Sequence, residues 1–159
     1  MNLHNPDSLP KYLVQTIKAR VLVVLQFTFL GLLFIRPGQP QYEIGSYIKP
    51  LTLGLTFLAS LILAWAIFNL RPALRVSPIP KPGAPLVSTG IYKWISHPMY
   101  FAVMLFGLSM FISHINYLSA AVLISLFLVL RTKAGLEEQL LEKIHGKYRP
   151  SGFLPMRGI

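Results

Sequence analysis

The stretch from Pro98 to Leu130 contains no Asp, Glu, Lys or Arg, and it limits the possible folds of the chain more than any other feature. About 20 apolar residues cross the hydrocarbon core of a bilayer, so the stretch is too long for one membrane span. It is interrupted by the polar segment 113–117, which is suited to a turn. The stretch therefore predicts a hairpin of two helices, over 98–113 and 117–134.

Two further apolar runs, over 13–35 and 48–70, reach spanning length. The first is followed by Arg36 and Pro37 without a small-residue cleavage pattern, which favours an uncleaved span over a signal peptide. Hydrophobic residues make up 53% of the 159 residues and charged residues 13%. A soluble domain of this size has too little interior for so much apolar surface. We expect one all-α domain, an integral membrane bundle of about four transmembrane helices.

The positions of the basic residues predict the orientation of this bundle. With four spans, all of the 15 Lys and Arg except Arg36 and Lys49 fall on one side. The positive-inside rule makes that side cytosolic, so both termini are expected in the cytosol. The net charge of +10 is distributed between the apolar runs rather than on one face, which argues against nucleic acid as a partner.

Two segments outside the spans are expected to be functional. The segment 71–97 is rich in Pro and Gly, and loops of this length without structure of their own are usually either functional or disordered. After the last span, residues 135–159 are expected to form an amphipathic cytosolic helix and a tail. An active site should therefore lie on the cytosolic side, between these two segments.

The chain has no Cys, and its four His residues are too scattered for a metal site.

Three groups of residues converge on that side. They are the extended piece 85–92, the segment 96–100 at the start of the hairpin, and the acidic pair Glu137 and Glu138. Ionisable groups at membrane sites are functional candidates. Each group also has a structural interpretation: the two carboxylates neutralise nearby basic residues, His97 caps a helix that has Pro98 in its first turn, and the aromatic residues lie at the membrane interface.

Taken together, these motifs are more specific. The order Leu86-Val87-x-x-Gly90-x-Tyr92, then His97-Pro98-x-Tyr100, a hairpin, and Glu137-Glu138-x-x-Leu141 resembles the isoprenylcysteine carboxyl methyltransferase family. The resemblance covers about residues 70 to 148, and related phospholipid methyltransferases share the architecture. It implies a membrane enzyme that uses S-adenosylmethionine without a Rossmann fold. The implied cofactor-binding residues are Ala84, Pro85, Leu86, Val87, Tyr92, His97, Pro98, Met99, Tyr100 and Glu137.

The resemblance also implies a lipophilic methyl acceptor that enters from the bilayer. Lys133 matches the position of a substrate-binding Arg in the family, and Lys133 or Arg131 would orient an acceptor carboxylate. Because a carboxylate is already ionised at pH 7, it needs no general base. An amine acceptor would need one, and Glu138 is the candidate. Carboxyl O-methylation is preferred; N-methylation of a phospholipid and a non-enzymatic membrane protein that keeps the fold are the alternatives.

Overall fold

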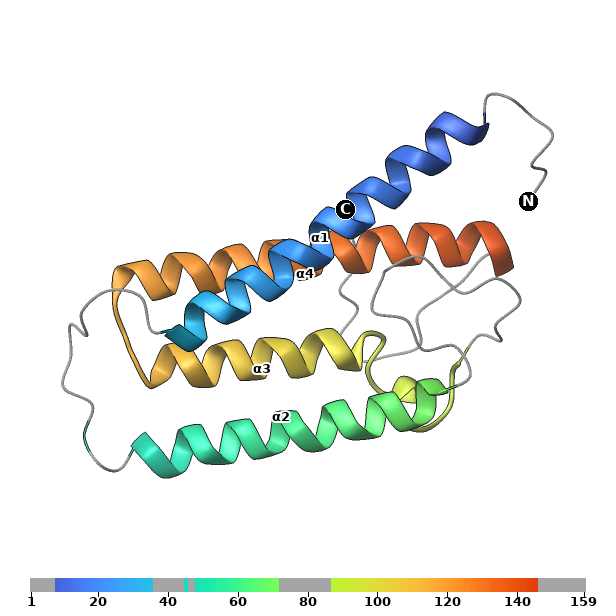
Figure 1. Cartoon of the computed structure of the whole chain (residues 1–159). Helices are drawn as coiled ribbons and strands as arrows, with labels where there is room; N and C mark the ends of the chain where they lie inside the picture. Colours follow the sequence, from blue (N-terminus) through green and yellow to red (C-terminus); the bar gives the residue numbers. More distant parts are fainter. Residues whose placement is uncertain (1–7, 36–44, 46–47, 72–86, 146–159) are drawn as a thin grey trace.

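A computed structural model of the chain describes residues 8–35, 45, 48–71 and 87–145. These residues form α-helices and one short 3-10 helix, and no strand occurs among them. The all-α prediction is therefore confirmed (Figure 1). The elements are α1 (Ser8–Ile35), α2 (Ile48–Leu70), η2 (Gly90–Lys93), α3 (Pro98–Ile112) and α4 (Tyr117–His145).

Three of these helices are long and apolar enough to cross a membrane, and they make the chain an integral membrane protein. The candidate spans are Leu13–Ile35, Ile48–Leu70 and Tyr117–Lys143. Helix α3 has only 15 residues, about 22 Å at 1.5 Å per residue, which is less than the hydrocarbon thickness of about 30 Å. The predicted hairpin is present, since α3 and α4 run antiparallel and are joined by residues 113–116 (Figure 1).

The start of α4 is fixed by reciprocal hydrogen bonds across the turn. The Ser119 backbone N–H donates to the Asn116 side-chain oxygen at 2.8 Å, and the Asn116 N–H donates to the Ser119 hydroxyl at 3.2 Å. Both residues are buried. Asn is a favoured N-cap because its short side chain satisfies a backbone N–H that has no partner within the helix. The polar patch seen in the sequence is therefore a capped turn.

Helix α4 continues past residue 134 without interruption, so the amphipathic helix expected from residue 135 is the C-terminal end of α4. The 29 residues of α4 measure about 43 Å, longer than one span. Leu136 belongs to the same buried cluster as Val129, and Leu140 packs against that cluster. An unbroken apolar stripe therefore holds this end of α4 on α1, and the bundle gains a helical extension beyond the apolar run.

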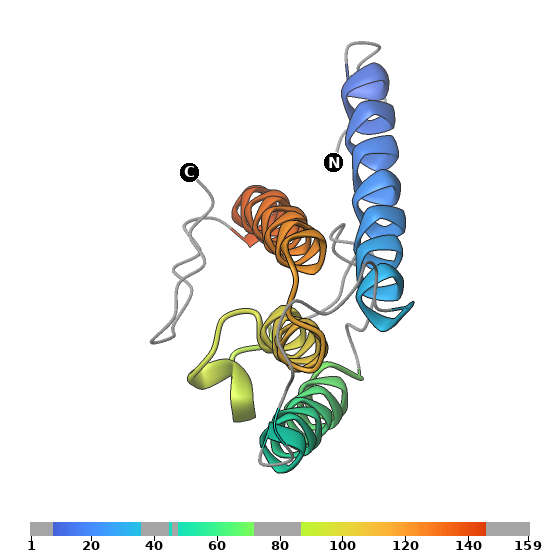
Figure 2. The same cartoon turned by 90° about the vertical axis from the view of Figure 1, so that its left-hand side faces the viewer.

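The helices pack in the order α2, α3, α4 and α1 (Figure 2). One buried cluster lies between α1 and α4, and a second joins Leu33 of α1 to Leu126 and Leu130 of α4, with side chains of α3 packed on it. Helix α2 contacts α3 through hydroxyls: Ser109 donates to the Thr52 carbonyl at 2.8 Å and lies 2.9 Å from the Thr56 hydroxyl. Large apolar side chains on the outer faces of α1 and α2 are exposed, as expected for helices surrounded by lipid.

The chain enters the site region through Gly90, the first residue of η2. Gly90 has φ +61°, in the left-handed region that favours glycine. A Cβ at this position would overlap the side chain of Asn69, whose amide donates to the Trp65 carbonyl at 2.9 Å. Both the backbone conformation and the close approach of α2 therefore require glycine here.

We expect Gly90→Ala to lower the free energy of unfolding by about 1–2 kcal/mol from the left-handed backbone alone, with a further loss from the overlap. The double variant Asn69→Ala/Gly90→Ala removes the overlap and keeps the backbone cost, so it should recover part of the loss. Unfolding in detergent, followed by circular dichroism, measures both. A Gly90→Ala variant as stable as the parent would contradict this interpretation of the turn.

Candidate active site

The first part of the site is the start of α3, which follows η2 directly. His97 is the N-cap residue: its carbonyl accepts the Phe101 N–H at 3.0 Å, and Pro98 occupies the first turn as predicted. The His97 side chain makes no capping hydrogen bond. Its imidazole is therefore available to another element, and the capping interpretation holds for the backbone alone.

That other element is the C-terminal end of α4, which carries the acidic pair. His97 Nε2 lies 3.0 Å from Glu138 Oε1, and His97 Nδ1 lies 3.7 Å from Glu137 Oε2. The Tyr100 hydroxyl donates to Glu137 Oε2 at 2.8 Å. The two sequence motifs, 37 residues apart between Tyr100 and Glu137, thus form one hydrogen-bonded cluster. We call His97, Tyr100, Glu137 and Glu138 the polar cluster.

The carboxylates and the imidazole of the polar cluster differ in how far they are exposed. The side chains of His97 and Glu138 are 8% and 16% exposed, whereas that of Glu137 is 31% exposed. The rings of His97 and Tyr100 stack with centroids 5.4 Å apart and an interplanar angle of 14°. Glu137 is therefore the carboxylate of the acidic pair that a ligand can reach. Stacking restricts the orientation of the His97 and Tyr100 rings beside it.

Lys133, one turn before Glu137 on α4, is buried inside the bundle with 1% exposure. Its ammonium lies 5.0 Å from the centroid of the Tyr100 ring and donates a hydrogen bond to Gln26 of α1. Gln26 is itself 5% exposed. Gln26 is not among the residues predicted for the site, although an amide in the middle of the apolar run of the first span was a signal for it.

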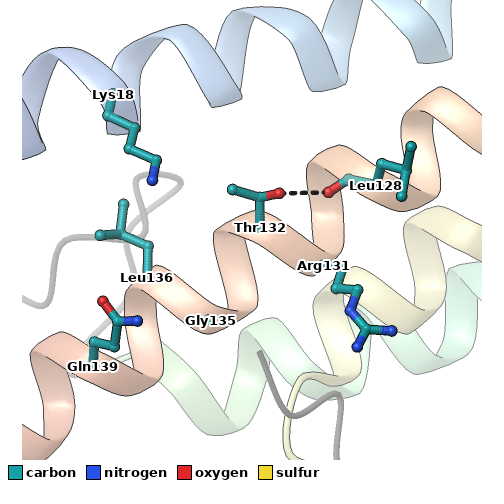
Figure 3. A pocket seen from close by; sticks show the side chains of 7 residues that line it. All are labelled: Lys18, Leu128, Arg131, Thr132, Gly135, Leu136 and Gln139. Carbon is teal, nitrogen blue, oxygen red and sulfur yellow. Dashed lines mark hydrogen bonds between the residues drawn. The ribbon is translucent and has the colours of Figure 1, made fainter. Parts of the chain in front are cut away.

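Arg131, the alternative to Lys133, does not join the polar cluster. Successive residues of an α-helix are rotated by about 100°, so Arg131 lies about 200° around α4 from Lys133. It lines a groove between α1 and α4 together with Lys18 (Figure 3). The structure thus separates two basic residues that the sequence left as alternatives.

The remaining predicted cofactor residues fall into two groups. Val87, Tyr92 and Met99 are half-buried and Pro98 is buried, all beside η2 or at the start of α3. Ala84, Pro85 and Leu86 lie outside the described residues.

Within the described part of the chain, the Ser96 hydroxyl is buried without a hydrogen-bond partner. A buried hydroxyl without a partner costs free energy, so Ser96 indicates a place where a ligand can supply one.

The described residues thus define a helical membrane protein with a cluster of ionisable side chains at one end of a helical hairpin. The model of the isoprenylcysteine carboxyl methyltransferase (ICMT) family matches residues 52–143, more than half of the chain. The chain belongs to this family, and its members are methyltransferases. The match begins in α2, so it contains the polar cluster and Lys133 but not Gln26. Comparisons with curated proteins and with solved structures gave no match.

Proposed function

We propose that this protein transfers a methyl group from S-adenosylmethionine to the carboxylate of a lipophilic, isoprenylcysteine-like acceptor. The observation that carries the proposal is the polar cluster, in which hydrogen bonds from His97 and Tyr100 to the acidic pair of α4 join the two family motifs. We further propose that α3 serves as a fourth, short span and that both termini are cytosolic. The polar cluster then faces the compartment that contains the cofactor.

The chemistry of the described residues fits S-adenosylmethionine. Glu137, the more accessible carboxylate of the acidic pair, suits the ribose hydroxyls, which donate hydrogen bonds. The unpartnered hydroxyl of Ser96 suits the carboxylate end of the cofactor. His97 and Tyr100, which the acidic pair already engages, would contact the cofactor through their rings. When bound, the cofactor supplies a methyl group activated by a sulfonium.

An aromatic ring attracts a cation by about 0.5–2 kcal/mol. The Tyr100 ring already stacks on His97 and has the Lys133 ammonium near it. Tyr92, which the family resemblance places against the cofactor and which is half-buried on η2, is the aromatic residue that we assign to the sulfonium. In this arrangement Tyr100 orders the polar cluster, while Tyr92 contributes to cofactor affinity.

Lys133 supports a carboxylate acceptor rather than an amine. Its buried ammonium lies one helical turn before Glu137 and is held by Gln26, and a fixed positive charge attracts an acceptor carboxylate. Glu138, the candidate base for an amine acceptor, is already held by His97 at 3.0 Å. Orienting an ionised acceptor needs no proton transfer, and orientation alone can supply roughly 7–11 kcal/mol of rate enhancement. The chain's own residues thus act mainly by binding and alignment.

The preferred acceptor class is tested with purified protein in detergent and methyl-labelled S-adenosylmethionine. We expect labelled product from an S-prenylated cysteine with a free carboxylate, released as a base-labile methyl ester, and no product when that carboxylate is amidated. An ethanolamine phospholipid is assayed in parallel. Product from the phospholipid alone would replace the O-methylation proposal by N-methylation, and no product from either acceptor would contradict the proposed acceptor classes.

A further inference from the structure

A second site candidate lies on the opposite face of α4 from Glu137. A groove between α1 and α4 has a volume of about 220 Å³ and is lined by Lys18 of α1 and by Arg131, Thr132 and Gln139 of α4 (Figure 3). Leu128 and Leu136 also line it, and Gly135 contributes no side chain. We call this the α1–α4 groove. It is outside the polar cluster, and the methyl-transfer proposal makes no use of it.

The groove contains two basic side chains that have no acidic partner among the described residues. Figure 3 shows the Lys18 side chain extending from α1 toward α4 and the Arg131 side chain on the side of α4 that faces away from α1. No ion pair within 4.0 Å joins either of them to a described carboxylate; the ion pairs found there both involve His97. The Thr132 hydroxyl is engaged by the Leu128 carbonyl at 2.8 Å. The groove is thus positive, and its polarity suits an anion.

The groove continues into an apolar surface in one direction only. On α1, Val21 and Leu25 follow Lys18 at helical spacing on the same face and are 50% and 36% exposed. On α4, Leu128 and Ile124 precede Arg131 on the same face and are 55% and 60% exposed. The cluster that joins Leu136 to Ala19, and the one that joins Val122 to Leu33, show that the two helices are antiparallel. Both apolar surfaces therefore extend from the basic end toward the centre of the spans.

We propose that the α1–α4 groove binds an anionic phospholipid, with the phosphate at the basic end that Lys18 and Arg131 line and an acyl chain along the apolar surfaces. A positive end joined to an apolar track inside the spans matches a lipid, which has its charge at the membrane surface and its chains in the core. A soluble phosphate would use the basic end alone. This bound lipid would hold α1 against α4, and α1 carries the Gln26 that meets Lys133.

The test is native mass spectrometry of the full chain in neutral detergent, titrated with phosphatidylglycerol and with phosphatidylcholine of the same acyl chains. We expect the parent to prefer phosphatidylglycerol. The variant Lys18→Gln/Arg131→Gln should bind it about thirtyfold more weakly, which is about 2 kcal/mol at 1.4 kcal/mol per tenfold. Lys18→Gln alone, a change at an exposed residue, should weaken binding about fivefold and provides a second variant if the double variant misfolds.

The matched control is Arg20→Gln/Lys143→Gln, which removes the same charge from exposed positions on the same two helices outside the groove. It should keep the parent's affinity for phosphatidylglycerol. Equal losses in the control and the groove variant would show general attraction to a basic protein and overturn the site. So would equal affinity of the parent for both lipids. Displacement of the lipid by millimolar glycerol 1-phosphate would assign the groove to a soluble phosphate instead.

Discussion

Replacing Glu137 by Gln is expected to lower kcat/KM for methyl transfer by about 100-fold or more, which corresponds to about 2.7 kcal/mol. The substitution keeps the shape of the side chain and removes its charge. The Glu137 carboxylate accepts from Tyr100 at 2.8 Å, lies 3.7 Å from His97, and is exposed enough for a ligand to reach. Hydrogen bonds to an ionised acceptor are roughly twice as strong as neutral ones, so an amide cannot replace them.

The control for this prediction is Glu142→Gln, the same change at an exposed position on the same helix. It should leave kcat/KM within threefold of the parent value. The radiolabel assay described for the prenylated cysteine measures both variants. If Glu137→Gln kept more than a third of the parent kcat/KM, Glu137 would have no direct part in binding or catalysis. The polar cluster would then be a structural contact between α3 and α4.

Gln26→Leu is expected to lower the free energy of unfolding by about 2–3 kcal/mol. The buried ammonium of Lys133 would lose the Gln26 oxygen as an acceptor. A buried polar group without its partner costs about 1–3 kcal/mol, and more when it is charged. The Tyr100 ring, 5.0 Å away, offers only a partial replacement.

Two further variants separate the lost hydrogen bond from other effects of the substitution. Gln26→Leu/Lys133→Met replaces both partners by apolar side chains and should recover most of the stability, because no buried charge then lacks the Gln26 acceptor. Gln15→Leu makes the same change at a half-buried position of α1 and should have little effect. Denaturant unfolding in detergent gives all four values. A double variant no more stable than Gln26→Leu would contradict the pairing as the cause.

The helix boundaries could be predicted in the uncharged part of the chain, but not where apolar and charged residues alternate. Residues 98–130 carry no charge, so the hairpin and its polar turn could be placed within a few residues. Beyond residue 134, charged residues suggested a new surface helix. The helix in fact continues, because Leu136 and Leu140 still pack against the α1–α4 interface. Packing against another helix is a tertiary property that local composition does not report.

The same distinction applies to the site. The meeting of His97 and Tyr100 with the acidic pair followed from recognising the family motifs together, since neither motif alone predicts a partner about 40 residues away. The bond between Gln26 and Lys133 joins residues 107 positions apart, and the sequence contains no information on the register of α1 against α4. The choice between Lys133 and Arg131 needed the rotation of α4 about its axis. Only the packed bundle fixes that rotation.

The most direct test of the proposed activity is calorimetric titration of S-adenosylhomocysteine into the detergent-solubilised full chain. We predict micromolar affinity for the parent and a loss of about 100-fold or more in His97→Ala and in Glu137→Gln, with Glu142→Gln unchanged. Circular dichroism confirms that each variant is folded. A well-folded parent that gives no binding heat with millimolar S-adenosylhomocysteine would contradict the account, since the polar cluster would then hold the helices together without forming a cofactor site.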